Sequence, residues 1–213
     1  MTRPEISFYT CELSTHIKNA NVSHIISINK VIKFTKNNPG FIKFSKLNMD
    51  RASIKVYTDA SWNNLPNGGS QGGQIVLITD DDNRTAPISW NSKRLKRVAR
   101  STLAAESLSL MEGCDTAFYI KKLLTEISCC SSNIPVMAIT DNDSLYETSS
   151  STKQVLDRRL RVEISAIREM CERQEISLRW VDKKKQISDV LTKKGASSEC
   201  LMKILQHGVL NQI

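Results

Sequence analysis

The sequence contains no hydrophobic run long enough to cross a membrane. No stretch of the 213 residues approaches the roughly 20 consecutive apolar residues that a transmembrane helix needs. The segment that begins at Met1 also lacks the basic and apolar regions of a secretory signal. We therefore expect an intracellular protein without a membrane partner.

Metal-binding cysteine patterns are also absent. The sequence has no CxxC motif and no cysteine–histidine spacing of the kind that holds zinc. Cysteines of intracellular proteins generally stay reduced. We therefore expect free, mostly structural thiols and no zinc site. The cysteines are Cys11, Cys114, Cys129, Cys130, Cys171 and Cys200.

Positive charge, in contrast, is in excess. The net charge at pH 7 is +8 and the pI is about 9.2, values that suit a polyanionic partner. Part of this charge is clustered before two acidic residues, Glu106 and Asp189, although a solvated charged surface is the alternative interpretation for either cluster alone. The two clusters are Lys93, Arg94, Lys96, Arg97 and Arg100, and Lys183, Lys184 and Lys185.

Four acidic residues stand at the edges of predicted structural elements. Asp59 and Asp141 each end an apolar, strand-like run, which is where open α/β sheets build their sites. Glu106 lies inside a helix-like stretch, and Asp189 lies in a late apolar segment. A carboxylate at the tip of an apolar strand is costly to desolvate unless a cation or donor meets it. If the four converge, they indicate divalent cations held by oxygen ligands, and hence phosphate chemistry.

Hydrophobic patterning predicts an α/β protein with a mixed sheet. From residue 53 onward the segments follow the order β-β-β-α-α-β-α-β-α. Strands that come first, followed by helices between strands, predict a five-stranded mixed sheet flanked by helices in one domain of ordinary size. We expect strands at 54–58, 74–79, 86–90, 136–140 and 176–181, and helices at 101–113, 116–127, 156–171, 187–192 and 198–205.

The first 50 residues differ from the rest. Residues 22–36 have helical spacing and end before the breaker sequence 37–40, whereas residues 41–47 alternate as a short strand would. A helix and a strand alone provide no core of their own. We therefore divide the chain into 1–50, a main domain at 51–195, and a C-terminal helical tail at 196–213.

Four motifs, in order, carry a resemblance to a known family. They are Tyr57-Thr58-Asp59-Ala60-Ser61, Val98 to Glu106, Thr140-Asp141-Asn142, and Ser188 to Lys193. These motifs resemble the ribonuclease H domain of Ty1/copia-type retrotransposon Pol polyproteins, and residues 1–50 resemble the end of the connection that joins the reverse transcriptase to that domain. The resemblance implies a ribonuclease H-like fold, reverse transcriptase domains of the same polyprotein as partners, and a location in the cytoplasm, a virus-like particle or the nucleus.

The same resemblance implies two-metal chemistry. It assigns Asp59 as the carboxylate that bridges both ions, Glu106 and Asp141 as the remaining ligands of one ion, and Asp189 as the ligand of the other. The reaction it implies is hydrolysis of the RNA strand of an RNA–DNA hybrid. Mg²⁺ suits such a site because it demands octahedral geometry and keeps water ligands, and Mn²⁺ is a possible substitute.

Choosing RNA over DNA requires contacts to 2′-hydroxyl groups in the wide minor groove, together with cationic contacts to phosphates. Short polar side chains near the first strand end and the basic cluster before Glu106 are the candidates. The expected nucleic-acid-binding residues are Ser61, Asn91, Ser92, Lys93, Arg94, Lys96, Arg97, Arg100 and Lys184.

One departure from the family pattern concerns histidine. Many ribonucleases H carry a histidine in the loop after the last strand, whereas residues 182–186 here contain none. We interpret this as a loss of efficiency, because the acidic residues are all present.

Two other functions stay open. A strand-transfer or nuclease activity of the integrase and resolvase type would use a similar fold, but the motif spacing and the basic cluster argue against it. A catalytically decayed or co-opted module that binds nucleic acid or a polymerase partner is disfavoured by the presence of all four acids. Taken singly, each acid also has an ordinary interpretation: a surface residue for Glu106, strand-end capping for Asp59 and Asp141, and a helix-dipole contact for Asp189.

Overall fold

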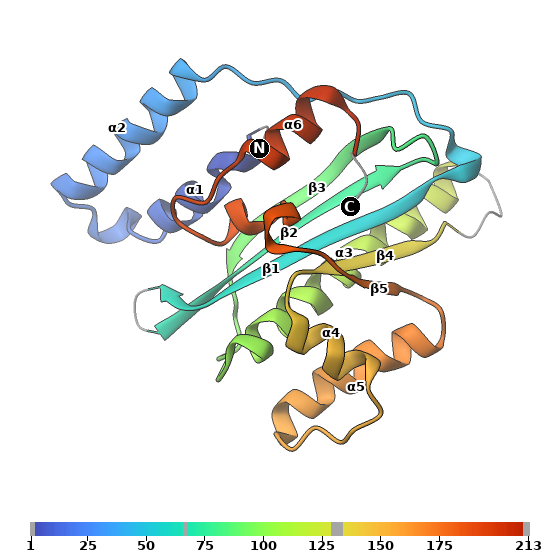
Figure 1. Cartoon of the computed structure of the whole chain (residues 1–213). Helices are drawn as coiled ribbons and strands as arrows, with labels where there is room; N and C mark the ends of the chain where they lie inside the picture. Colours follow the sequence, from blue (N-terminus) through green and yellow to red (C-terminus); the bar gives the residue numbers. More distant parts are fainter. Residues whose placement is uncertain (1–2, 66–67, 129–133, 211–213) are drawn as a thin grey trace.

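A five-stranded mixed sheet forms the centre of the computed structural model, which describes residues 3–65, 68–128 and 134–210 (Figure 1). The strand order is β3-β2-β1-β4-β5, with β1, β2 and β3 antiparallel and with β4 and β5 parallel to β1. The predicted mixed sheet with flanking helices is confirmed. The strands are β1 (Ser53–Leu65), β2 (Gly69–Thr79), β3 (Thr85–Arg94), β4 (Val136–Thr140) and β5 (Ser177–Trp180).

One face of the sheet packs against helices α3 (Thr102–Ser128) and α5 (Arg158–Glu172), and α4 (Asp143–Ser150) lies beside them. Because side chains alternate along a strand, Ile54 and Val56 of β1 both point to this face. They belong to a core that includes apolar residues of both long helices.

The opposite face is covered by the chain that follows β5, which crosses β1 and β2 and ends in α6 (Glu199–His207) (Figure 1). Tyr57 and Ile75 point to this side and pack with Leu201 and Leu205 of α6, all of them fully buried. The chain after β5 therefore closes a second core on the sheet.

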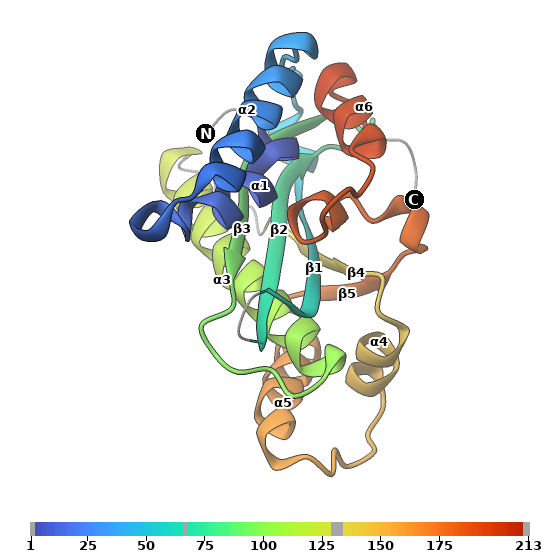
Figure 2. The same cartoon turned by 90° about the vertical axis from the view of Figure 1, so that its left-hand side faces the viewer.

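The N-terminal helices α1 (Ser7–Ser14) and α2 (Val22–Asn37) differ in how they are held. Helix α1 contacts β3 and buries Phe8. Helix α2 buries no side chain, and both views show it at the periphery with α1 beside it (Figures 1 and 2). Short 3-10 helices complete the described elements: Pro4–Ile6, Ile17–Asn19, Met49–Arg51, Lys183–Lys185 and Asp189–Leu191.

Several sequence-based expectations were wrong. Residues 41–47 form no strand, because they run beside α6 rather than beside a strand, and the Lys43 N–H donates to the Leu205 carbonyl (2.8 Å). The two helices predicted at 101–113 and 116–127 are the single helix α3, and α1 and α4 were not predicted.

The four described cysteines, Cys11, Cys114, Cys171 and Cys200, are free thiols, whereas Cys129 and Cys130 lie outside the described residues. Among the described helices, none is both long and apolar enough to span a bilayer.

Candidate active site

Two of the four acids meet because β1 and β4 are parallel neighbours. Tyr57 lies opposite Ile139 in the register, so Asp59 and Asp141, each two residues further along, form the next pair on the same face of the sheet. Asp141 directly follows the last residue of β4, and the carboxyl ends of parallel strands share one edge of the sheet. Both side chains are buried, with exposed fractions of 1% for Asp59 and 5% for Asp141.

Helix α3 brings Glu106 to the same place by lying close against β1. A Cβ atom at Gly113 would stand 2.5 Å from Thr58 Cγ2, so only glycine permits this approach. One turn earlier, the Ser109 hydroxyl donates to the Asp59 carbonyl (2.8 Å). Glu106 lies one further turn toward the N-terminus, on the same side of α3, and is therefore buried beside Asp59.

The fourth acid, Asp189, lies in the segment that crosses the opposite face of the sheet. A Cβ atom at Gly73 of β2 would stand 2.7 Å from both Leu191 Cβ and Thr192 Cγ2, so this glycine lets the segment lie on the strands. Asp189 begins its 3-10 helix. As a result, Asp59, Asp141 and Asp189 each present a carboxylate oxygen, and these oxygens all lie within 4.8 Å of one another.

Burial is the largest influence on the pKa values of Asp59 and Glu106. Burial raises the pKa of Asp59 from 3.8 to about 6; Lys193 opposes this rise, and Asp189 adds to it. The pKa of Glu106 lies well above its ordinary value because of burial first, and then because of the charges of Asp59 and Asp141. Glu106 Oε2 is buried without a hydrogen-bond partner. A nearby cation would therefore stabilise the ionised forms of Asp59 and Glu106.

Three further residues contact the acids, and the sequence analysis assigned none of them a role. Lys193 Nζ lies 3.2 Å from Asp59 Oδ1 and 2.7 Å from Asp189 Oδ1, and the Thr192 hydroxyl donates to Asp59 Oδ2. Gln186 Nε2 donates to Asp141 Oδ1 (3.3 Å). Burial alone would lower the pKa of Lys193, but the carboxylates of Asp59 and Asp189 raise it above its usual value. The i,i+4 spacing of Asp189 and Lys193 was the signal that could have identified this lysine.

Three of the four acids, Asp59, Glu106 and Asp141, line an open pocket of about 420 Å³, and Asp189 meets it through its ion pair with Lys193, which also lines the pocket. This donor set fits a hard divalent cation. Carboxylate oxygens are the preferred ligands of such ions, and the unpartnered Glu106 Oε2 is an oxygen with free capacity inside the site. Ser61, Trp62 and Lys183 also line this pocket.

The predicted nucleic-acid contacts fall into three groups. Ser61 lines the acidic pocket, and of the three lysines at 183–185 the pocket includes Lys183 rather than the predicted Lys184. Ser92 lies across β2 from Asp59, and its hydroxyl donates to the Leu191 carbonyl. Asn91 lies next to it on β3.

The basic cluster surrounds the end of β3 and the connection to α3. Lys93 pairs with Glu112 (3.1 Å), and Arg97 pairs with Glu163. The other three side chains are exposed to solvent and are Arg94, Lys96 and Arg100.

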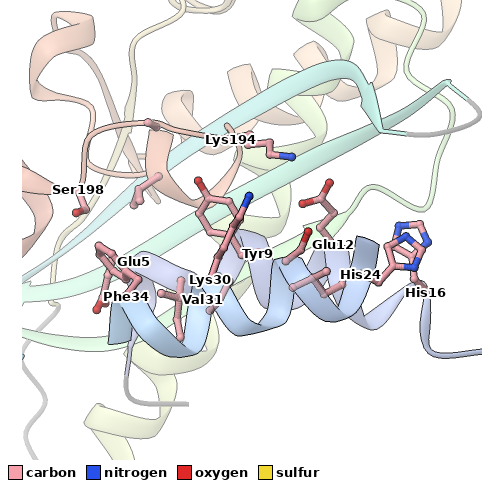
Figure 3. Close-up of a pocket in the computed structure, with 15 residues that line it drawn as sticks. Glu5, Tyr9, Glu12, His16, His24, Lys30, Val31, Phe34, Lys194 and Ser198 are labelled. Atoms are coloured by element: carbon pink, nitrogen blue, oxygen red, sulfur yellow. The ribbon is translucent and has the colours of Figure 1, made fainter. Parts of the chain in front are cut away.

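A separate hollow of about 550 Å³ lies between α1, α2 and the segment after Asp189 (Figure 3). Tyr9 stands in its wall, and its hydroxyl accepts the Gly195 N–H (2.9 Å). Lys194 lines this hollow, whereas its neighbour Lys193 lines the acidic pocket. The two adjacent lysines therefore face different surfaces.

A scan against known protein families finds no match. The sequence is 25% identical over 193 residues to the retrovirus-related Pol polyprotein from transposon RE1 of Arabidopsis thaliana, and 26% identical over 193 residues to that from transposon RE2. Each match covers 90% of this chain and 13% of the length of the relative.

Solved structures with a similar fold include LC11-RNase H1, isolated from compost (TM-score 0.49, 17% identity, 66% of this chain and 92% of that one). RNase H1 from Halobacterium salinarum has a TM-score of 0.49 and 15% identity, covering 70% of this chain and 97% of that one. The foamy viral protease-reverse transcriptase, in complex with an RNA/DNA hybrid, has a TM-score of 0.48 and 14% identity, covering 82% of this chain and 26% of that one. The two Arabidopsis sequences confirm the resemblance that the four motifs predict, which is to the Pol polyproteins of retrotransposons.

Proposed function

We propose that the acidic pocket hydrolyses the RNA strand of RNA–DNA hybrids with the help of Mg²⁺, as part of retrotransposon reverse transcription. The observation that carries this proposal is the convergence of Asp59, Asp141 and Asp189, whose oxygens lie within 4.8 Å of one another. Three carboxylates so close together repel one another, and a site that keeps them together is suited to divalent cations.

The four acids would divide the work of holding two ions. Asp59, which is grouped with Asp141 and Asp189 and whose charge also acts on Glu106, would contribute to both ions. Glu106 and Asp141 would complete one site and Asp189 the other. Bound ions of this kind activate a water molecule for attack and stabilise the leaving oxygen of the phosphodiester. Burial and the neighbouring acids raise the pKa of Glu106, whereas the positive charge of bound ions would favour its ionised form.

The surroundings of the pocket support a hybrid as substrate. Ser61 and Lys183 line the pocket, and the exposed Arg94, Lys96 and Arg100 extend the positive charge beside α3. We assign the hydroxyl of Ser61 to a contact with a 2′-hydroxyl, and the cations to contacts with phosphates of either strand.

The N-terminal part of the chain supports a polymerase partner. Helix α2 exposes apolar side chains that a monomeric domain would normally cover. We assign this face, together with the neighbouring hollow in Figure 3, to contact with the reverse transcriptase domains of the same polyprotein. The exposed apolar residues of α2 are Val22, Ile25, Ile26, Ile28, Ile32 and Phe34.

The test is a cleavage assay on an end-labelled RNA–DNA hybrid, with Mg²⁺, with Mn²⁺ and with EDTA. Asp59→Asn should abolish cleavage while leaving hybrid binding largely intact, because other residues make the proposed phosphate contacts. Asp82→Asn is a matched control with the same charge change, in the exposed hairpin turn where Asp82 pairs with Arg84.

Two results would overturn the proposal. Cleavage that persists in Asp59→Asn or in EDTA would remove the acidic pocket from the reaction. Hybrid binding by the wild-type chain without cleavage under any metal would favour the decayed, nucleic-acid-binding module instead. Duplex DNA and duplex RNA, run in parallel, separate hybrid hydrolysis from a general nuclease or strand-transfer activity.

A further inference from the structure

The ammonium group of Lys193 occupies the place of a cation between two buried or partly buried acids. Its Nζ atom contacts Asp59 Oδ1 and Asp189 Oδ1 at 3.2 Å and 2.7 Å. These two carboxylates, with Asp141, are the group whose oxygens lie within 4.8 Å of one another. The ammonium therefore neutralises the same oxygens that divalent cations would require.

The backbone of Lys193 is held by a hydrogen bond, whereas its side chain is partly exposed to solvent. Its backbone N–H donates to the Asp189 carbonyl (2.9 Å), which sets the side chain one turn after Asp189. The side chain is 41% exposed, whereas that of Asp59 is 1% exposed. A long side chain with this exposure can swing its charged end into solvent while the carboxylates stay in place.

Lysine and a divalent cation cannot share these oxygens. An ammonium group donates hydrogen bonds and occupies the lone pairs of the carboxylate oxygens, and two positive charges at one site repel each other. Lys183, the other lysine in the wall of the pocket, is exposed. Lys193 is therefore the lysine that stands in the way of a metal ion.

We propose that Lys193 is a displaceable counter-ion, which holds Asp59 and Asp189 together in the metal-free protein and is expelled toward solvent when a divalent cation binds. This inference rests on the proposed function, because it takes the acidic pocket to be a metal site. It makes Lys193 a positioning residue that keeps the site assembled before loading and lowers the affinity of the site for metal.

The test compares metal binding by the wild-type chain, Lys193→Met and Lys194→Met in calorimetric titrations with Mg²⁺ and with Mn²⁺. Methionine keeps most of the length of lysine without its charge. Lys194→Met is the matched control, because it removes the same charge from the adjacent residue, which faces the other hollow (Figure 3). Lys193→Met should bind metal about tenfold more tightly than wild type, equivalent to about 1.4 kcal/mol of removed competition. Lys194→Met should change the affinity by less than about twofold, because its charge is more distant and screened.

Thermal unfolding gives a second readout that does not depend on catalysis. In EDTA, Lys193→Met should unfold at a lower temperature than wild type, because its acids lose their counter-ion. Saturating Mg²⁺ should raise its unfolding temperature by more than it raises that of wild type. If Lys193→Met does not fold, the wild-type protein still allows the test. The protected ammonium signal of Lys193 in ¹H–¹⁵N spectra, assigned by its loss in Lys193→Arg, should disappear as Mg²⁺ is added.

The outcomes separate this inference from the proposed function. Equal or weaker metal binding by Lys193→Met than by wild type, or an ammonium signal that persists at saturating Mg²⁺, would overturn the counter-ion role and leave the metal site intact. No binding by wild type or by either variant would overturn the metal site and this inference together. Loss of binding in Asp59→Asn, with tighter binding in Lys193→Met, would support both.

Discussion

Replacing Asp59 with asparagine should make the metal-free protein more stable while removing its metal site. The Asp59 carboxyl group is 1% exposed, and its pKa rises from 3.8 to about 6, first because of burial. At about 1.4 kcal/mol per pH unit, ionisation of this group destabilises the folded state by about 3 kcal/mol at neutral pH. Asparagine has a similar shape and no charge, so it should recover much of this free energy.

The sign of the effect gives it a definite pH window. Because the pKa is raised on folding, the stability that the protonated carboxyl contributes is fully present below pH 3.8 and is lost as the pH rises through about 6. Wild-type protein in EDTA should therefore lose stability over this range relative to Asp59→Asn. Above pH 7 the two should differ by a constant amount.

Urea unfolding in EDTA at pH 4, 6 and 7.5 provides the measurement. At pH 7.5 we expect Asp59→Asn to be more stable by up to about 3 kcal/mol, which for a chain of this size corresponds to an unfolding temperature higher by roughly 6–12 °C. Saturating Mg²⁺ should stabilise wild type but not the variant. An asparagine variant that is less stable than wild type at pH 7.5 would refute the conclusion that ionised Asp59 destabilises the metal-free fold. A stability difference between the two proteins that does not vary with pH would refute it as well.

Three further predictions follow from the packing and the surface. Gly113→Ala should destabilise the protein by about 1 kcal/mol in urea unfolding and lower the cleavage rate. A Cβ atom 2.5 Å from Thr58 Cγ2 costs about 1–3 kcal/mol of overpacking, whereas alanine gains about 1 kcal/mol in helix propensity. Equal stability of the variant and wild type would mean that α3 does not pack closely against β1 at this position. Lys96→Ala should weaken hybrid binding and lower the slope of log K against log salt by about 1 if this exposed lysine contacts a phosphate, and an unchanged slope would exclude the contact. Ile25→Asp on α2, where the side chain is 56% exposed, should change the stability of the isolated chain by less than about 0.5 kcal/mol but weaken its association with a reverse transcriptase fragment in sedimentation, and normal association would place that partner elsewhere.

The core of the site could be predicted because its residues sit at the ends of local patterns. Asp59 and Asp141 each end an apolar run, and a parallel arrangement of those two runs was enough to bring them together. The residue that faces Asp59 from the last segment was missed, because Lys193 looks like one of many lysines until the segment is folded onto the sheet. Its meeting with Asp59 spans 134 positions of sequence, which no local pattern encodes.

The errors in the fold also have a physical cause. A glycine inside a helical pattern usually weakens a helix, and Gly113 led to the prediction of two helices where there is one. In α3 the glycine is needed for contact with β1, so tertiary packing outweighs propensity. Residues 41–47 alternate like a strand, but the neighbouring segment is α6, which offers a carbonyl at its end rather than a row of donors and acceptors.

The acidic pocket depends on apolar packing around the segment that carries Asp189 as well as on the acids themselves. The segment that carries Asp189 is held against the sheet by Val190 and Leu191, and α6 then buries Leu201 and Leu205 on the same face. A fully buried apolar side chain of this kind contributes about 1.5–3 kcal/mol. Two of them are enough to offset the roughly 3 kcal/mol that the ionised Asp59 costs. The fold can therefore keep the buried Asp59 carboxylate charged, because apolar burial in the second core, which α6 closes, offsets the destabilisation that this charge causes.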